Sequence, residues 1–227
     1  MPQLNWYKTS YYLCFITSFI LIITAAYFSV ISFMNIGVNQ QIIALKQRDD
    51  LPVLQLEKLV KRQKAVTSIA GSGLMYQDLS LAEILLAKRY GYFSPEGRKL
   101  LEDSYKHIQK GIELSPARSI GWTRLAYIKL LLEEPSKDVA DIINMAIILE
   151  PDNFDSMYFR IQLAMSVWQY CTEDQKELIR QQIRLGWHKH MWRTLSLVKN
   201  KISYDIVDEA MRESGDYEKF IKRVKKY

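Results

Sequence analysis

The hydrophobic pattern of this chain begins with one long apolar block, and amphipathic segments follow it. Residues 11–34, YYLCFITSFILIITAAYFSVISFM, are apolar, aromatic or hydroxyl-bearing, and residues 9–45 contain no charged side chain. A helix over residues 11–34 would extend about 36 Å, which is enough to cross a bilayer. The block therefore predicts a transmembrane helix, and the alternative is a helix buried in a protein core.

The kind of membrane segment follows from its length and its flanks. A cleavable signal peptide has an apolar region of roughly 7–15 residues and a small-x-small cleavage pattern, and neither is present here. We predict an uncleaved signal anchor after a short tail of residues 1–10. Trp6, Tyr7, Tyr11 and Tyr12 would form an aromatic belt at one membrane interface.

Flanking charges do little to orient this helix. Lys8 stands on the short side, whereas Lys46 and Arg48 on the other side are offset by neighbouring acids. A short tail before a long domain is the usual layout of a signal anchor. We therefore expect a bacterial inner-membrane protein with its tail in the cytoplasm and its C-terminal domain in the periplasm.

The remainder of the chain has the periodicity of helices. Residues 35–50 are expected to be a linker or a helix extension, and residues 51–227 an all-helical soluble domain. In residues 51–70 apolar positions recur at helical spacing, and GSG at 71–73 ends the run. Residues 79–93 predict the next helix.

Capping signals mark further helix starts. Ser94 before Pro95 predicts a start with proline in the first turn, and Thr172 with Gln175 predicts a capping box. Ser203 and Asp216 are expected to cap two short helices near the C-terminus. No run of alternating β-branched residues ends in a hairpin turn. The fold class is therefore all-α, with sequential helices packed as antiparallel neighbours.

Two segments repeat each other at an offset of 35 residues. Ile108, Gly111, Leu114 and Pro116 recur as Ile143, Ala146, Leu149 and Pro151. A small residue allows a neighbouring helix to approach closely, and a proline just past the helix end prevents its continuation. The next helix then carries a large-large-small triplet of Trp122, Leu125 and Ala126.

This pattern resembles tetratricopeptide repeats, whose period is about 34 residues. The resemblance covers roughly residues 75–170 and implies stacked helix pairs with a groove for a partner. The predicted repeat positions are Gly111, Pro116, Trp122, Leu125, Ala126, Ala146 and Pro151. The triplet is lost after Pro151, where Met157, Arg160 and Ile161 stand, so an irregular bundle is the alternative.

A narrower resemblance rests on LLAKRY, on WTRLA and on LEPDN followed by R-x-x-LA and Trp168. Together with a single anchor, these motifs resemble small membrane-anchored accessory proteins of proteobacterial exopolysaccharide biosynthesis. The resemblance implies a helper of polysaccharide polymerisation or export, without catalytic residues.

Motifs of enzymes and cofactor sites are absent from the sequence. It contains no GxGxxG, GxxxxGK[ST], HExxH, GxSxG or CxxC motif. His188 and His190 lie two positions apart, so on a helix they diverge, whereas Trp187 and Met191 are expected to pack inward. We expect no cofactor, no metal site and no enzymatic activity.

Positive charge gathers in the C-terminal third, and the formal net charge is +6. Residues 178–204 contain no acid, and they carry the candidate surface for an anion or a partner: Arg180, Arg184, Lys189, Arg193, Lys199 and Lys201. Such a surface could bind anionic lipid, anionic glycan or an acidic protein, or it could be a solvated helix face. A membrane anchor and the lack of a recognised binding module argue against nucleic acid.

Two functions therefore follow from the sequence. The first is a non-catalytic scaffold or assembly subunit of a multi-subunit cell-envelope complex, acting through protein–protein contacts. The alternative is a module that binds lipid or anionic glycan through its basic C-terminal helices.

Overall fold

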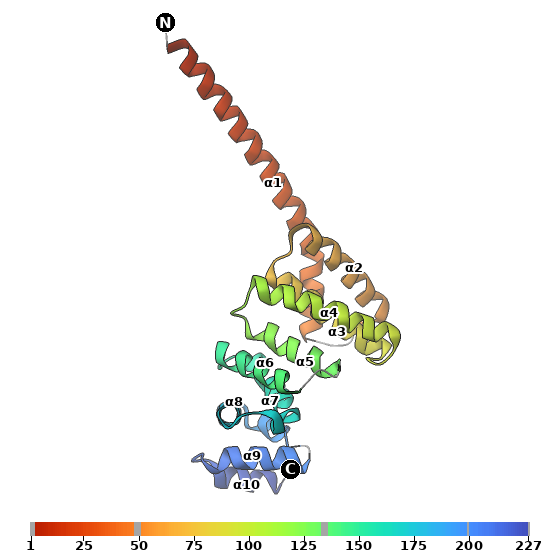
Figure 1. Ribbon diagram of the computed structural model, residues 1–227, viewed down its shortest axis with the longest axis vertical. Coiled ribbons are helices and arrows are strands. Elements are labelled where there is room, and N and C mark those ends of the chain that lie inside the picture. The colour runs from red at the N-terminus through yellow and green to blue at the C-terminus, as the bar shows by residue number, and fades with distance from the viewer. Residues whose placement is uncertain (1–2, 48–50, 133–135, 199, 227) are drawn as a thin grey trace. The chain divides into compact units, whose positions relative to one another are not determined.

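The protein is all-α, as the sequence predicts. The computed structural model describes residues 3–47, 51–132, 136–198 and 200–226, and in these ranges every regular element is helical. The chain divides into two compact units, Met1–Gly71 and Ser72–Tyr227 (Figure 1). The first contains one helix long and apolar enough to span a membrane, and the second is built from helix pairs.

Helix α1, Gln3–Gln47, contains the candidate span Ser10–Val30. These 21 residues extend about 32 Å, close to the thickness of a hydrocarbon core. None of the span is buried, so α1 is not the buried core helix of the alternative. Thr17 and Thr24 donate hydrogen bonds to backbone carbonyls one turn earlier, which satisfies their hydroxyl groups inside the apolar segment.

The helix continues past the span without interruption, so residues 35–47 are a helix extension rather than a linker. Of the predicted aromatic belt, Tyr11 and Tyr12 are exposed, with ring centroids 6.2 Å apart. The side chains of Trp6 and Tyr7 lie outside the described ones.

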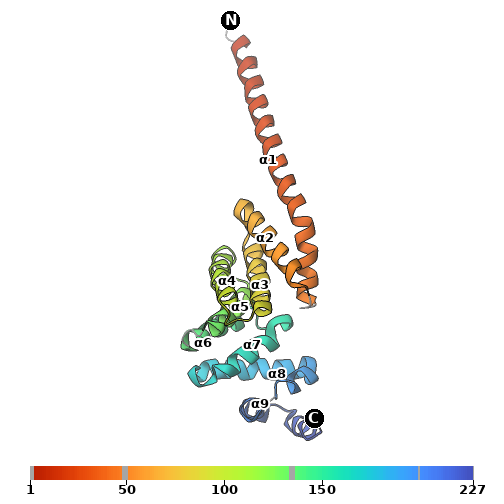
Figure 2. The ribbon, with the colours of Figure 1, turned by 90° about the vertical axis from the view of Figure 1, so that its right-hand side faces the viewer.

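Helix α2, Val53–Ala70, turns back alongside α1 within the first unit (Figure 2). Its residues divide cleanly into two faces, because the buried positions recur every three or four residues. The buried side chains are Leu56, Leu59, Val60, Gln63, Val66 and Thr67. Near its C-terminal end, the carbonyl of Ile69 accepts a hydrogen bond of 3.0 Å from the Tyr27 hydroxyl of α1.

The second unit is a succession of paired helices. Their bounds are α3 Gly73–Tyr90, α4 Pro95–Leu114, α5 Ser119–Leu131, α6 Ser136–Leu149, α7 Phe154–Ser166, α8 Glu173–Leu195, α9 Lys201–Arg212 and α10 Tyr217–Val224, with a 3₁₀ turn, η1, at Trp168–Tyr170. Helices α3 and α4, α5 and α6, and α7 and α8 pack as pairs, and α9 packs on α8. Each pair follows the previous one along the unit (Figure 1).

Side-chain capping marks the starts of α3, α4, α8 and α9. The Ser94 hydroxyl caps α4 with Pro95 in the first turn, and the Thr172–Gln175 capping box is present at the start of α8, as predicted. Helix α3 begins at residue 73 rather than 79, because the Ser72 hydroxyl accepts a hydrogen bond from the Met75 amide.

Of the two helix N-caps predicted near the C-terminus, Ser203 was wrong, and Asp216 stands at the N-cap position without the predicted side-chain bond. Asn200 caps α9 in a capping box in which Ser203 is the third helical residue, so Ser203 is the partner of the cap and not the cap itself. Asp216 stands before α10 but makes no side-chain capping bond.

The second unit contains two apolar clusters. One joins α3, α4 and α5 around Leu101, Ile108 and Ile128, and the other extends from α5 to α10. Tyr127 of α5 packs against both clusters. The pairs are therefore joined by continuous packing rather than by the turns alone.

Candidate protein-interaction surface

The first predicted repeat position, Gly111, lies where α3, α4 and α5 meet, and such a contact between helix pairs is here called a joint. A Cβ atom added at Gly111 would lie 2.8 Å from Gln77 Cγ and 3.0 Å from the Gly73 carbonyl oxygen. A Cβ atom at Gly121 would lie 3.0 Å from Gln77 Nε2. The missing side chains let α4 and α5 both approach this glutamine of α3. The sequence pattern pointed to Gly111 only, although Gly121 is equally a glycine within a helical run.

Pro116 and Trp122 are linked directly. The indole N–H of Trp122 donates a hydrogen bond of 2.8 Å to the Pro116 carbonyl, across the turn between α4 and α5. Its ring packs against the first apolar cluster but is only partly buried. Trp122 therefore stabilises the turn between α4 and α5 by its hydrogen bond, in addition to packing between the helices.

The remaining repeat positions are distributed between core and turn. Leu125, Ala126 and Ala146 are buried, and Ala126 and Ala146 are fully so. Pro151 is exposed in the turn between α6 and α7. The small residues thus lie on packed helix faces, and both prolines lie in turns.

Arg160 of α7 donates hydrogen bonds to carbonyls at the C-terminal end of α6, a role that the sequence pattern did not reveal. Its guanidinium group is fully buried and donates to the carbonyls of Ala146 and Glu150 at 3.1 and 3.0 Å. It also donates to Gln182 Oε1 of α8 at 2.9 Å. Burial lowers the pKa of Arg160 to about 10. One side chain thus joins α6, α7 and α8.

Glu150 makes a second polar link between pairs. Its carboxylate accepts hydrogen bonds of 2.6 Å from the Ser119 hydroxyl of α5 and from the Asn153 side chain. These hydrogen bonds lower the pKa of Glu150. The start of α5 is therefore tied to the turn between α6 and α7.

Three aromatic side chains, Tyr92, Tyr127 and Phe159, form a row across successive pairs, here called the aromatic row. Tyr92 lies in the turn after α3, Tyr127 on α5 and Phe159 on α7. The two tyrosine hydroxyls are 3.0 Å apart, and the Tyr127 and Phe159 ring centroids are 5.1 Å apart in edge contact. Phe159 is 36% exposed.

The row places aromatic surface on the first helices of two neighbouring pairs. Stacked helix pairs use such continuous faces to bind other chains. Tyr92 and Tyr127 are 35 residues apart, the same offset as the repeat, and this spacing was the signal that sequence analysis missed.

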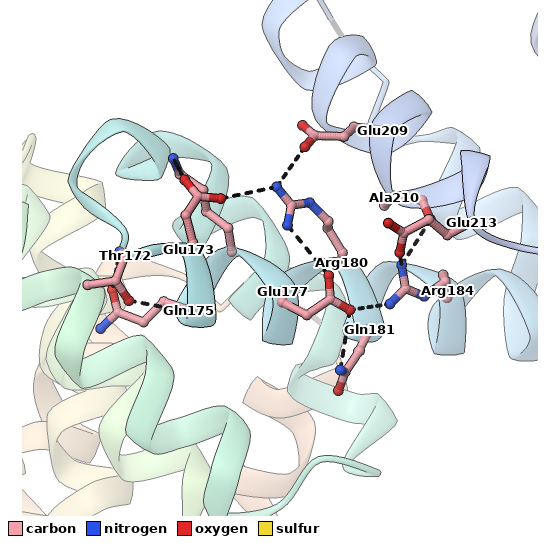
Figure 3. A network of polar contacts seen from close by, with 11 residues as sticks. Thr172, Glu173, Gln175, Glu177, Arg180, Gln181, Arg184, Glu209, Ala210 and Glu213 are labelled. Atoms are coloured by element: carbon pink, nitrogen blue, oxygen red, sulfur yellow. Dashed lines mark hydrogen bonds and ion pairs between the residues drawn. The ribbon is translucent and has the colours of Figure 1, made fainter.

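The predicted basic surface is largely neutralised on α8. Arg180 pairs with Glu209 of α9 at 2.6 Å and also contacts Glu173 and Glu177 (Figure 3). Arg184 pairs with Glu177 and with Glu213 of α9. The two arginines of the acid-free stretch are thus paired with acids from the first turns of α8 and from α9. These two arginines fasten α8 to α9, and an external anion would have to displace those acids.

The other predicted cations are more open. Lys189 Nζ lies 5.2 Å from the Phe154 ring centre, and the Arg193 guanidinium lies 5.7 Å from that of Tyr158. Lys201 is exposed, and Lys199 lies outside the described residues.

His188 and His190 are both exposed, whereas Trp187 is buried and Met191 packs against the core, as expected. His190 has non-helical backbone angles, so α8 is kinked there. Among the described residues, no three His, Cys, Asp or Glu side chains are grouped so that they could hold a metal ion.

Comparison of the chain with known protein families, with curated proteins and with solved structures found no match.

Proposed function

We propose that this chain is a membrane-anchored, non-catalytic scaffold subunit that binds a partner protein through the aromatic row. One observation carries the proposal: a row of aromatic contacts crosses successive helix pairs and ends in the exposed ring of Phe159, on a chain whose apolar span Ser10–Val30 is unburied. An apolar span of this length with no buried residue needs a bilayer or an apolar partner to cover it.

The resemblances extend the proposal. Helix pairs with tetratricopeptide-like joints use a face of the stack to hold a segment of another chain. The resemblance to accessory proteins of exopolysaccharide biosynthesis gives the partner a class, an inner-membrane subunit that polymerises or exports polysaccharide. In this proposal the second unit lies in the periplasm.

Partner binding is tested by quantitative co-purification of the full chain from native membranes in mild detergent. The Phe159→Ala variant removes the exposed aromatic ring of the row and should lower partner recovery at least several-fold. Ile148→Ala is the matched control, because Ile148 is 57% exposed on α6 and lies outside the row. A wild-type chain that purifies alone, or equal recovery with both variants, contradicts the proposal.

A further inference from the structure

The first unit contains a second surface that the scaffold function does not use. The Tyr27 hydroxyl joins α1, within the candidate span, to the Ile69 carbonyl at the C-terminal end of α2. The last carbonyls of a helix have no partner within the helix. Tyr27 supplies one for α2 where it meets the apolar segment.

This hydrogen bond fixes the depth of α2 once α1 lies in a bilayer, which rests on the proposed anchoring. Tyr27 stands three residues before the end of the span at Val30, or about 4.5 Å inside the edge of the hydrocarbon. Because α2 runs back alongside α1 (Figure 2), each residue before Ile69 lies about 1.5 Å further out.

Three side chains then fall at the level of the lipid headgroups. Lys64, Arg62 and Lys61 lie about 3, 6 and 7.5 Å beyond the hydrocarbon edge, within a headgroup layer roughly 5–8 Å thick. Ile69, which is 50% exposed, lies at the level of the last turn of the span. The apolar side chain of Ile69 thus lies at the depth of the hydrocarbon, and the basic side chains lie at the depth of the headgroups.

The exposed face of α2 has the composition of a membrane-facing surface. Lys58, Lys61 and Arg62 are exposed on it beside one exposed acid, Glu57, and the exposed Ala65 stands among them at helical spacing. The opposite face of the helix is buried. Basic side chains directly beside a transmembrane helix are attracted to anionic headgroups over a Debye length.

We propose that the exposed face of α2 binds anionic lipid headgroups at the membrane surface from which α1 emerges. Lys61 and Arg62 contact the headgroup phosphates, and Tyr27 holds α2 at that depth. The anchor therefore selects its lipid neighbours as well as fixing the chain to the bilayer.

The test uses the full chain in nanodiscs of phosphatidylcholine with about one-third phosphatidylglycerol. Cys14 and Cys171 are replaced by serine, and Ala65→Cys carries a fluorophore. Quenching is measured with a spin label near the head of the acyl chain, carried either by phosphatidylglycerol or by phosphatidylcholine. We expect at least about twofold stronger quenching by the labelled phosphatidylglycerol.

Matched charge variants decide the outcome. Lys61→Gln with Arg62→Gln should bring the two quenching efficiencies together, whereas Lys219→Gln with Lys222→Gln, which removes the same charge from α10, should leave the difference unchanged. An Ala65 probe that neither lipid quenches overturns the depth assignment. A difference that persists in the Lys61/Arg62 variant overturns the lipid assignment. Both failures are independent of partner co-purification, which tests the scaffold function.

Discussion

Replacing Arg160 by methionine tests whether this buried side chain holds three helices together. The guanidinium group donates to carbonyls at the end of α6 and to a side chain of α8. Methionine has a similar length and no donor, so it keeps much of the packing and removes the hydrogen bonds together with the charge.

The expected cost follows from two opposed effects. Each buried acceptor left without a donor costs about 1–3 kcal/mol. The buried acceptors affected are the Ala146 carbonyl and Gln182 Oε1, because the Glu150 and Pro151 carbonyls keep hydrogen bonds from the Asn153 amide and from Gln182 Nε2. Removing a buried charge returns part of this cost, because the guanidinium no longer has to be kept from water. We expect a net loss of about 3 kcal/mol in the free energy of unfolding. For a unit of this size that corresponds to a fall of about 6–12 °C in Tm.

The assay is urea unfolding of the full chain in mild detergent, followed by the helical circular dichroism signal. Arg98→Met is the control, because Arg98 is 55% exposed and its ion pair with Glu102 is worth less than about 1 kcal/mol. Arg160→Lys should be intermediate, since one ammonium group cannot reach all of the acceptors of the guanidinium group. Equal stability of Arg160→Met and Arg98→Met would refute the reasoning, because the desolvation cost would then cancel the hydrogen bonds.

Three further predictions concern the joints between pairs. Trp122→Ala should lower the free energy of unfolding by about 1–3 kcal/mol, which is less than the 3–5 kcal/mol typical of a fully buried tryptophan. Trp122→Phe should lower it by only about 1 kcal/mol, through loss of the hydrogen bond to Pro116. Urea unfolding measures both changes. The pKa of Glu150 lies below its ordinary 4.5, because its carboxylate accepts two hydrogen bonds. The stability that the Glu150 carboxylate contributes is therefore present above pH 4.5 and is lost as the pH falls through the lowered pKa of the folded state. Glu150→Gln should flatten the acid limb of a Tm–pH profile, and an unchanged acid limb would contradict this role. A double-mutant cycle on Arg180 and Glu209 should give a coupling of about 0.5–1 kcal/mol that weakens as salt is raised, and a coupling of zero at low salt would show that the pair does not fasten α8 to α9.

The sequence predicted the helical architecture well, because its signals are local. An uncharged apolar block, a serine before a proline and a capping box each act within one or two turns. The start of α3 and the cap of α9 were misplaced for the same reason. Ser72 and Asn200 are equally good caps, and sequence alone does not rank neighbouring polar residues.

The candidate surfaces depended on contacts between distant segments and were harder to predict. Arg180 and Arg184 stand in an acid-free stretch, yet Glu209 and Glu213 reach them from α9. In the sequence, Arg160 stands where the repeat pattern is lost. Its structural role was not visible there, because its acceptors lie on α6 and α8. The return of α2 to Tyr27 likewise joins residues 42 positions apart.

The most direct test of the scaffold function is site-specific photocrosslinking in living cells. A photoreactive amino acid is placed at Phe159 in the aromatic row and, separately, at Ile148 on α6. We predict one discrete adduct with a membrane-protein partner from position 159 and none from position 148. No adduct at position 159, or the same adducts from both positions, would contradict the claim that the aromatic row binds a partner.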